Sequence, residues 1–159
     1  MGTGAATSFP AGKGGGVGRD SPLNRAEILA LVNYRLEQAQ TALEDGKFLI
    51  KGGRSPQSIV NRAYYAMFYA ALALLQKVGK VPSKHTGVIS LFDTEFVIRG
   101  IFPKDLSRNF HKAFEMRQIF DYHVLELASA AKAQEILQKA VSFVEAVRKY
   151  LLECGGNDS

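Results

Sequence analysis

The sequence has too few cysteines and histidines to support a disulfide framework or a structural metal site. Its single cysteine, Cys154, cannot form an intrachain disulfide bond, and a reducing cytoplasm is the simplest compartment for such a chain. Three histidines (His85, His111 and His123) and one cysteine are a poor basis for a zinc site. We therefore expect neither a metal nor a cofactor.

Long apolar runs are also missing. The longest, AYYAMFYAALALL, covers residues 63–75, whereas a membrane-spanning helix needs roughly 20 apolar residues. We interpret this run as a buried core helix.

A strong charge of one sign is absent as well, because the net charge is only +5 over 159 residues. Basic side chains nevertheless concentrate in residues 99–117, where Asp105 and Glu115 are the acidic residues. The basic residues of this stretch are Arg99, Lys104, Arg108, Lys112 and Arg117. Such a cluster suits an anionic partner, although a solvated basic face is its commoner meaning.

Residues 1–23 contain seven glycines and few apolar residues, so we expect this segment to be disordered. Its GKGGGVG stretch lacks the spacing of a Walker A motif and no strand precedes it. We interpret it as a linker, a leader or an expression remnant. The folded domain is expected over residues 24–154, with a disordered tail at 155–159.

Apolar positions then recur at helical spacing. Residues 24–45 predict an amphipathic helix that Gly46 ends. Ser55 followed by Pro56 predicts the start of a second, central helix that runs to about Lys77, before Gly79.

Residues 83–98 predict a short or irregular helix, and a further helix starts near Pro103. The last helix is expected from about Glu126 to Glu153, with apolar residues on a 3.5-residue period. No alternating strand pattern occurs, so the fold class is all-α: an antiparallel up-and-down bundle of four main helices and one short helix.

The stretch RQIFDYH, residues 117–123, places a permanent charge on an apolar stripe. Counting back from Arg117 in helical steps gives Ala113, Phe110 and Leu106, which are all apolar. Stripping water from an arginine costs several kcal/mol or more unless the charge is paired. Either Arg117 is paired there, or a cleft opens at that point.

Arg117 and His123 would lie about 120° apart on a continuous helix, because each residue turns by about 100°. They can meet if the helix ends near Asp121 and His123 folds back, or if two copies combine their residues across a symmetric dimer. Asp121 does share a face with Arg117, so it could hold the guanidinium in place. The structural alternative is that Arg117 and Asp121 form only a partly buried ion pair.

Three stretches, SIVNRAYYAMFYAALALL (58–75), KHTGVISLFDTEFVIRG (84–100) and FEMRQIFDYH (114–123), resemble the HEPN family, in particular its small stand-alone prokaryotic (UPF0332-like) proteins. The resemblance implies a helical bundle that commonly dimerises. It also implies a metal-independent endoribonuclease motif, Arg followed by four to six residues and His, which Arg117 and His123 match.

Under this resemblance the protein is the toxin of a pair whose antitoxin is a nucleotidyltransferase, and its products end in 2',3'-cyclic phosphates. Arg117 would polarise the scissile phosphate and His123 would act as general base or acid, because arginine supplies a fixed cation and histidine a near-neutral pKa. Asp121 would orient Arg117. Lys104, Arg108 and Lys112 would attract the RNA backbone.

Other polar residues have both structural and functional interpretations. Asn61, Arg62, Tyr65 and Tyr122 could line the same cleft, while tyrosines more often bury their rings in the bundle. Tyr122 is also a weak candidate for modification by a partner enzyme. His85, after the Pro82 turn, and His111, on a basic surface, are expected to be capping or surface residues.

Two further functions remain open: a non-catalytic HEPN module that binds a nucleotide or docks on a nucleotidyltransferase, and a purely structural dimerisation bundle.

Overall fold

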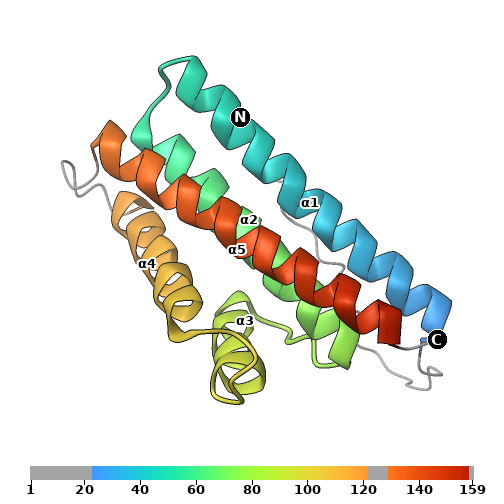
Figure 1. Ribbon diagram of the computed structural model, residues 1–159. Helices are drawn as coiled ribbons and strands as arrows, with labels where there is room; N and C mark the ends of the chain where they lie inside the picture. The colour runs from blue at the N-terminus through green and yellow to red at the C-terminus, as the bar shows by residue number, and fades with distance from the viewer. Residues whose placement is uncertain (1–22, 122–128, 158–159) are drawn as a thin grey trace.

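The computed structural model describes residues 23–121 and 129–157, and these form the predicted all-α bundle (Figure 1). The predicted disordered segment therefore falls, except for Leu23, outside the described residues. In chain order the elements are α1 (Arg25–Lys51), α2 (Pro56–Val78), α3 (His85–Phe92), the π-helix η2 (Asp93–Val97), α4 (Lys104–Asp121) and α5 (Ala130–Asn157).

Helix α1 begins where the sequence predicts and ends later. Asn24 forms a capping box: its side chain accepts a hydrogen bond from the Glu27 backbone N–H, and the Glu27 carboxylate accepts one from the Asn24 N–H. The prediction that Gly46 ends the helix is wrong, because α1 continues to Lys51. Gly46 is buried, and a Cβ there would lie 2.7 Å from Cδ1 of Leu137 on α5. The glycine therefore permits close packing of two helices.

Helix α2 is the centre of the bundle and has the predicted ends. Ser55 caps it by accepting a hydrogen bond from the Ser58 backbone N–H, and Pro56 occupies the first turn. Gly79 stops it in the left-handed conformation, with a φ of 72°. Helices α1, α3, α4 and α5 all contact α2, which explains why it is apolar nearly all round.

The segment between α2 and α4 forms a small aromatic corner. The predicted short, irregular helix is α3 followed by the π-helix η2. Phe92, Phe96 and Phe102 pack against one another, and Phe92 also contacts Phe110 of α4 and Phe143 of α5. These contacts fix α4 against the bundle.

Helix α4 and helix α5 run antiparallel to each other, as do α1 and α2 (Figure 1). The apolar residues at 3.5-residue spacing on α5 are all buried except Leu151, which is half-buried; the buried ones are Ala133, Leu137, Ala140, Val144 and Val147. The helix extends to Asn157, beyond the predicted end at Glu153. The four long helices thus form the up-and-down bundle that the apolar periodicity predicts.

Candidate functional site

Arg117 lies on the inward stripe of α4, as predicted, with Phe110 and Ala113 fully buried on the preceding turns. Its guanidinium carbon is 5.3 Å from the ring centroid of Tyr64 and 5.3 Å from that of Tyr65, both on α2. Aromatic faces attract cations by about 0.5–2 kcal/mol each. The tyrosines thus stabilise the charge that the sequence places against the core, and Arg117 itself is only half-buried.

Tyr64 is completely buried, and its ring packs against Tyr65, Phe68, Phe110 and Phe114. Its hydroxyl has no hydrogen-bond partner among the described residues. Burial raises the pKa of this hydroxyl, Tyr65 adds to the rise, and the positive charge of Arg117 opposes it. Tyr64 is therefore a neutral aromatic support for Arg117 at physiological pH.

A second arginine approaches Tyr65 from its own helix. The Arg62 guanidinium carbon is 5.5 Å from the Tyr65 ring centroid. Asn61 fixes this side chain, because its Oδ1 accepts hydrogen bonds from Nε of Arg62 at 3.1 Å and from Nη2 at 2.7 Å. Asn61, Arg62 and Tyr65 were predicted to line a cleft; in the structure they contact one another in sequence, and Tyr65 also contacts Arg117.

His85 joins the same group, contrary to its predicted capping or surface role. Lys84 occupies the N-cap position of α3. The half-buried His85 ring packs on Phe68, with 4.6 Å between the ring centroids, and edge-on to Tyr65, with 6.5 Å between the centroids. Gly87 permits the tight turn before α3, since a Cβ there would lie 2.9 Å from Pro82. The pKa of His85 is lowered, first by burial and then by the charge of Arg117.

Three elements thus converge on one tyrosine ring: α2 supplies Arg62 and Tyr65, α3 supplies His85 and α4 supplies Arg117. We call Arg62, Tyr64, Tyr65, His85 and Arg117 the arginine–tyrosine cluster. Two guanidiniums and an imidazole held on a partly exposed aromatic platform form a site that favours an anion such as a phosphate.

Helix α1 adds positive charge at the edge of this cluster. Burial and the neighbouring Tyr65 raise the pKa of the Tyr69 hydroxyl, while Arg62 and Arg35 of α1 lower it. Arg35 also donates a hydrogen bond of 2.7 Å from Nη1 to Oε1 of Gln38. The electrostatic field of the cluster therefore includes residues from α1, α2, α3 and α4.

The predicted RNA-binding residues lie elsewhere on α4. Lys104, Arg108 and Lys112 are all exposed, and Arg108 forms an ion pair with Asp105. Their four-residue spacing places them along one solvent face, turned away from the buried stripe that carries Arg117. The structure therefore separates this basic stripe from the arginine–tyrosine cluster.

His111 has a structural position. Its Nε2 lies 2.7 Å from Oδ2 of Asp93, whose Oδ1 accepts a hydrogen bond of 2.7 Å from the Ser107 hydroxyl. These bonds tie α4 to η2, and the exposed side chain of His111 agrees with its predicted surface position.

The structure does not describe the side chains of three predicted site residues, Asp121, Tyr122 and His123. Asp121 is the last residue of α4, and its side chain is not among those described. Tyr122 and His123 lie outside the described residues. The predicted meeting of Arg117 with Asp121 or His123 therefore stays a prediction.

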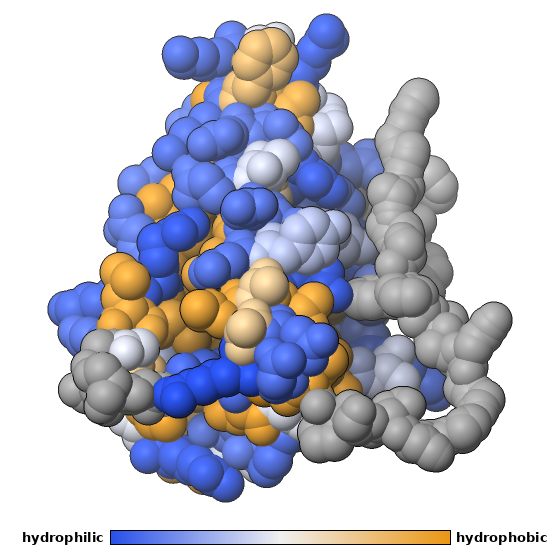
Figure 2. Space-filling model, turned by 90° about the vertical axis from the view of Figure 1, so that its right-hand side faces the viewer, coloured by the Kyte–Doolittle hydropathy of each residue, from blue (hydrophilic) through white to orange (hydrophobic). Residues whose placement is uncertain are grey.

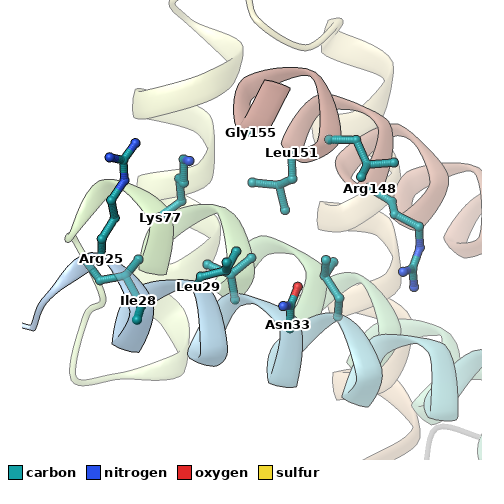
Figure 3. Close-up of a pocket in the computed structure, with 12 residues that line it drawn as sticks. Arg25, Ile28, Leu29, Asn33, Lys77, Arg148, Leu151 and Gly155 are labelled. Atoms are coloured by element: carbon teal, nitrogen blue, oxygen red, sulfur yellow. The ribbon is translucent and has the colours of Figure 1, made fainter. Parts of the chain in front are cut away.

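A groove of about 1050 Å³ lies at the end of the bundle where α1 begins and α5 ends. Ile28, Leu29 and Leu151 form part of its apolar wall, and Arg25, Lys77 and Arg148 add positive charge (Figure 3). Figure 2, viewed toward this end of the bundle, shows hydrophobic patches divided by hydrophilic residues. No local pattern in the sequence predicts this groove, because its residues come from three helices that are far apart in the chain.

Within residues 23–121 and 129–157, no helix combines the length and the apolar character needed to cross a bilayer. This agrees with the sequence-based interpretation of residues 63–75 as a core helix.

Known proteins resemble most of this chain. The family model described as HEPN domain matches residues 32–151. A Thermotoga maritima protein named "UPF0332 protein" is 36% identical over 121 residues, which cover 76% of this chain and 91% of the relative. A Methanocaldococcus jannaschii protein named "Putative toxin" is 34% identical over 129 residues, covering 81% of this chain and 92% of that protein. A second protein of that organism with the same kind of name is 31% identical over 117 residues.

Proposed function

The chain belongs to the HEPN domain family, and from this premise we propose that it is a metal-independent endoribonuclease, acting as the toxin of a toxin–antitoxin pair with a nucleotidyltransferase antitoxin. The toxin assignment is supported by the two relatives named as toxins. The observation that carries the nuclease proposal is the position of Arg117, whose guanidinium contacts Tyr64 and Tyr65, while Arg62 contacts the same Tyr65 ring.

Cleavage of RNA without a metal requires a fixed cation for the charge that builds on the phosphate oxygens. Two neighbouring aromatic rings of α2 contact the guanidinium of Arg117, and these contacts orient it before a phosphate binds. A proton-transfer group is also required, and His123 is proposed for this role. Asp121 would orient Arg117 from the next turn of α4.

The exposed basic stripe of Lys104, Arg108 and Lys112 would guide the RNA along α4. Arg108 precedes Arg117 by nine residues, so about 13 Å of helix axis separates them. The stripe would therefore contact backbone phosphates away from the scissile bond and contribute affinity that salt weakens.

The test is cleavage of total RNA in excess EDTA by the wild type, Arg117→Lys and His123→Ala. Arg117→Lys keeps the charge and removes the guanidinium fork, and we expect cleavage to fall by about 100-fold or more. We expect His123→Ala to lose about 100-fold to 10,000-fold. Glu115→Gln is the matched control, because Glu115 is exposed on the same helix and has no proposed role in the site; this variant should keep the catalytic rate.

Product chemistry gives a second readout, since the proposed reaction leaves a 2',3'-cyclic phosphate and a 5'-hydroxyl. Intact RNA after incubation with folded wild-type protein would contradict the nuclease proposal, as would undiminished cleavage by both variants. Growth arrest on expression that a co-expressed nucleotidyltransferase relieves would support the toxin role.

A second candidate is a HEPN module that docks on a nucleotidyltransferase without cutting RNA. The groove between α1, α2 and α5 favours it, because an apolar wall with Arg25, Lys77 and Arg148 nearby suits a partner surface. Folded wild type that binds such a partner and leaves RNA intact would favour this candidate.

A further inference from the structure

His85 occupies a position that its sequence context does not predict. It begins α3, yet its ring turns toward α2 and packs on Phe68 and Tyr65 at 4.6 Å and 6.5 Å. The ring is half-buried, so one part is fixed by aromatic contacts and another can be reached from solvent. An imidazole held in this way is oriented and accessible at once.

His85 and Arg117 flank the same aromatic ring. The Arg117 guanidinium carbon lies 5.3 Å from the Tyr65 ring centroid, and the His85 ring lies 6.5 Å from it. The two groups come from α3 and α4, and each is held by α2. A phosphate bound to the Arg117 fork would therefore bring its ribose into the neighbourhood of an imidazole.

The electrostatics of this position favour the neutral imidazole. Burial and the charge of Arg117 on α4 both lower the pKa of His85, which leaves it below the usual histidine value of about 6.5. From α2, Arg62 and Tyr65 face this side of the cluster, and the Arg62 guanidinium carbon lies 5.5 Å from the Tyr65 ring centroid. His85 is consequently in the form that accepts a proton.

Strand cleavage by the ribose 2'-hydroxyl needs two proton transfers: a base must take the 2'-hydroxyl proton, and an acid must protonate the leaving 5'-oxygen. A single Arg–His motif supplies one of these groups. The remaining group must come from another residue, from a second copy of the chain or from water.

We propose that His85 is the second proton-transfer residue of the site, acting as general base on the ribose 2'-hydroxyl while His123 acts as general acid. This inference rests on the proposed ribonuclease function. It goes beyond the Arg–His motif, which does not include residue 85.

The step balances as follows. The 2'-oxygen loses its proton to a ring nitrogen of His85 and forms a bond to phosphorus. The bond from phosphorus to the 5'-oxygen breaks, and the 5'-oxygen takes a proton from the His123 imidazolium. The products are a 2',3'-cyclic phosphate and a 5'-hydroxyl, and proton exchange with water restores both histidines.

The test compares wild type with His85→Ala and His85→Asn, using a defined single-stranded RNA in EDTA between pH 5 and pH 8. We expect kcat to fall by about 100-fold or more in both variants, and added imidazole to restore part of the rate of His85→Ala. In the wild type, kcat/KM should decline as the pH falls through the lowered pKa of His85, because protonated His85 cannot accept a proton. This acidic limb should disappear in the variants.

His111→Ala is the matched control, since His111 is paired with Asp93 and should leave the pH profile of the enzyme unchanged. Circular dichroism melting establishes that each variant is folded, and His85→Asn keeps a polar side chain of similar size should the alanine variant not fold.

The outcomes separate the two proposals. One outcome would overturn only the role of His85: the wild type is active, His123→Ala is inactive, and both His85 variants keep the wild-type rate. A rate loss that imidazole does not restore, with the acidic limb still present in the variants, would do the same. An inactive wild type would overturn the ribonuclease proposal and His85 with it.

Discussion

At the residue scale, Arg117 keeps its charge on the inward stripe of α4 because two tyrosine rings replace part of the water that it gives up. Tyr64 and Tyr65 each lie 5.3 Å from its guanidinium carbon. A cation on an aromatic face is stabilised without a second formal charge. The two rings therefore hold the guanidinium of Arg117 at a defined position on α4.

Tyr64 has a hydroxyl whose removal should stabilise the protein. The ring is fully buried in aromatic contacts, and the hydroxyl is a buried polar group without a partner among the described residues. Since an unsatisfied buried polar group costs about 1–3 kcal/mol, we expect Tyr64→Phe to raise the free energy of unfolding by about 1 kcal/mol. Urea denaturation monitored by circular dichroism measures this change.

Tyr65→Phe is the control for that substitution, because Tyr65 is only half-buried and its change should stay within about 0.5 kcal/mol. A clear loss of stability in Tyr64→Phe would mean that the Tyr64 hydroxyl is hydrogen-bonded in solution.

The local sequence predicted the inward position of Arg117, but it did not predict the surroundings of His85. The stripe of Phe110 and Ala113 lies on the same helix as Arg117, so its burial follows from helical spacing. The surroundings of His85 depend on Phe68, Tyr65 and Arg117, which lie 17 to 32 positions away in the sequence. Only the packing of α3 onto α2 and α4 brings these groups together.

At the element scale, the ends of the helices follow local chemistry where capping residues are present. Asn24, Ser55 and Gly79 stand at helix ends for reasons that a few neighbouring residues supply. Gly46 did not follow this rule, because a glycine that ends a helix and a glycine that admits a neighbouring helix look alike in sequence. The contact with Leu137 of α5, 91 positions later, distinguishes them.

Gly46→Val should therefore destabilise the bundle. Its Cβ would already lie 2.7 Å from Cδ1 and 3.2 Å from Cδ2 of Leu137, which is buried, and a β-branched side chain adds further atoms. Overpacking of this kind costs about 1–3 kcal/mol, and thermal unfolding measures the loss.

The same substitution at Gly155 of α5 is the control, since no atom lies within 4 Å of a Cβ built there. Equal stability of Gly46→Val and Gly155→Val would show that α1 and α5 do not pack closely in solution.

At the scale of the whole molecule, α2 organises both the core and the candidate site. It contacts α1, α3, α4 and α5, and its polar turn, Asn61 and Arg62, meets α3 and α4 at Tyr65. The bundle class and its core could be predicted from apolar periodicity. The composition of the arginine–tyrosine cluster could not, because no single helix contains it.

If the protein forms the homodimer that the family resemblance implies, a mixing experiment can test which residues act within one chain. Arg117 and His85 meet Tyr65 in the same chain. Helix α4 ends at Asp121 and His123 lies outside the described residues, so His123 can serve the Arg117 of its own chain or that of the other copy. Our prediction is the second arrangement, in which a symmetric dimer combines residues of both copies.

Two inactive variants should then complement each other only when one of them is His123→Ala. When Arg117→Ala and His123→Ala are mixed, unfolded and refolded together, half of the dimers are mixed, and each mixed dimer has one complete site. Cleavage should recover to about a quarter of the wild-type rate. Arg117→Ala mixed with His85→Ala should stay inactive, because each site in that mixed dimer lacks one of the two residues. If Arg117→Ala mixed with His85→Ala recovers activity, His85 and Arg117 act in different sites. If Arg117→Ala mixed with His123→Ala does not recover activity, His123 acts with the Arg117 of its own chain.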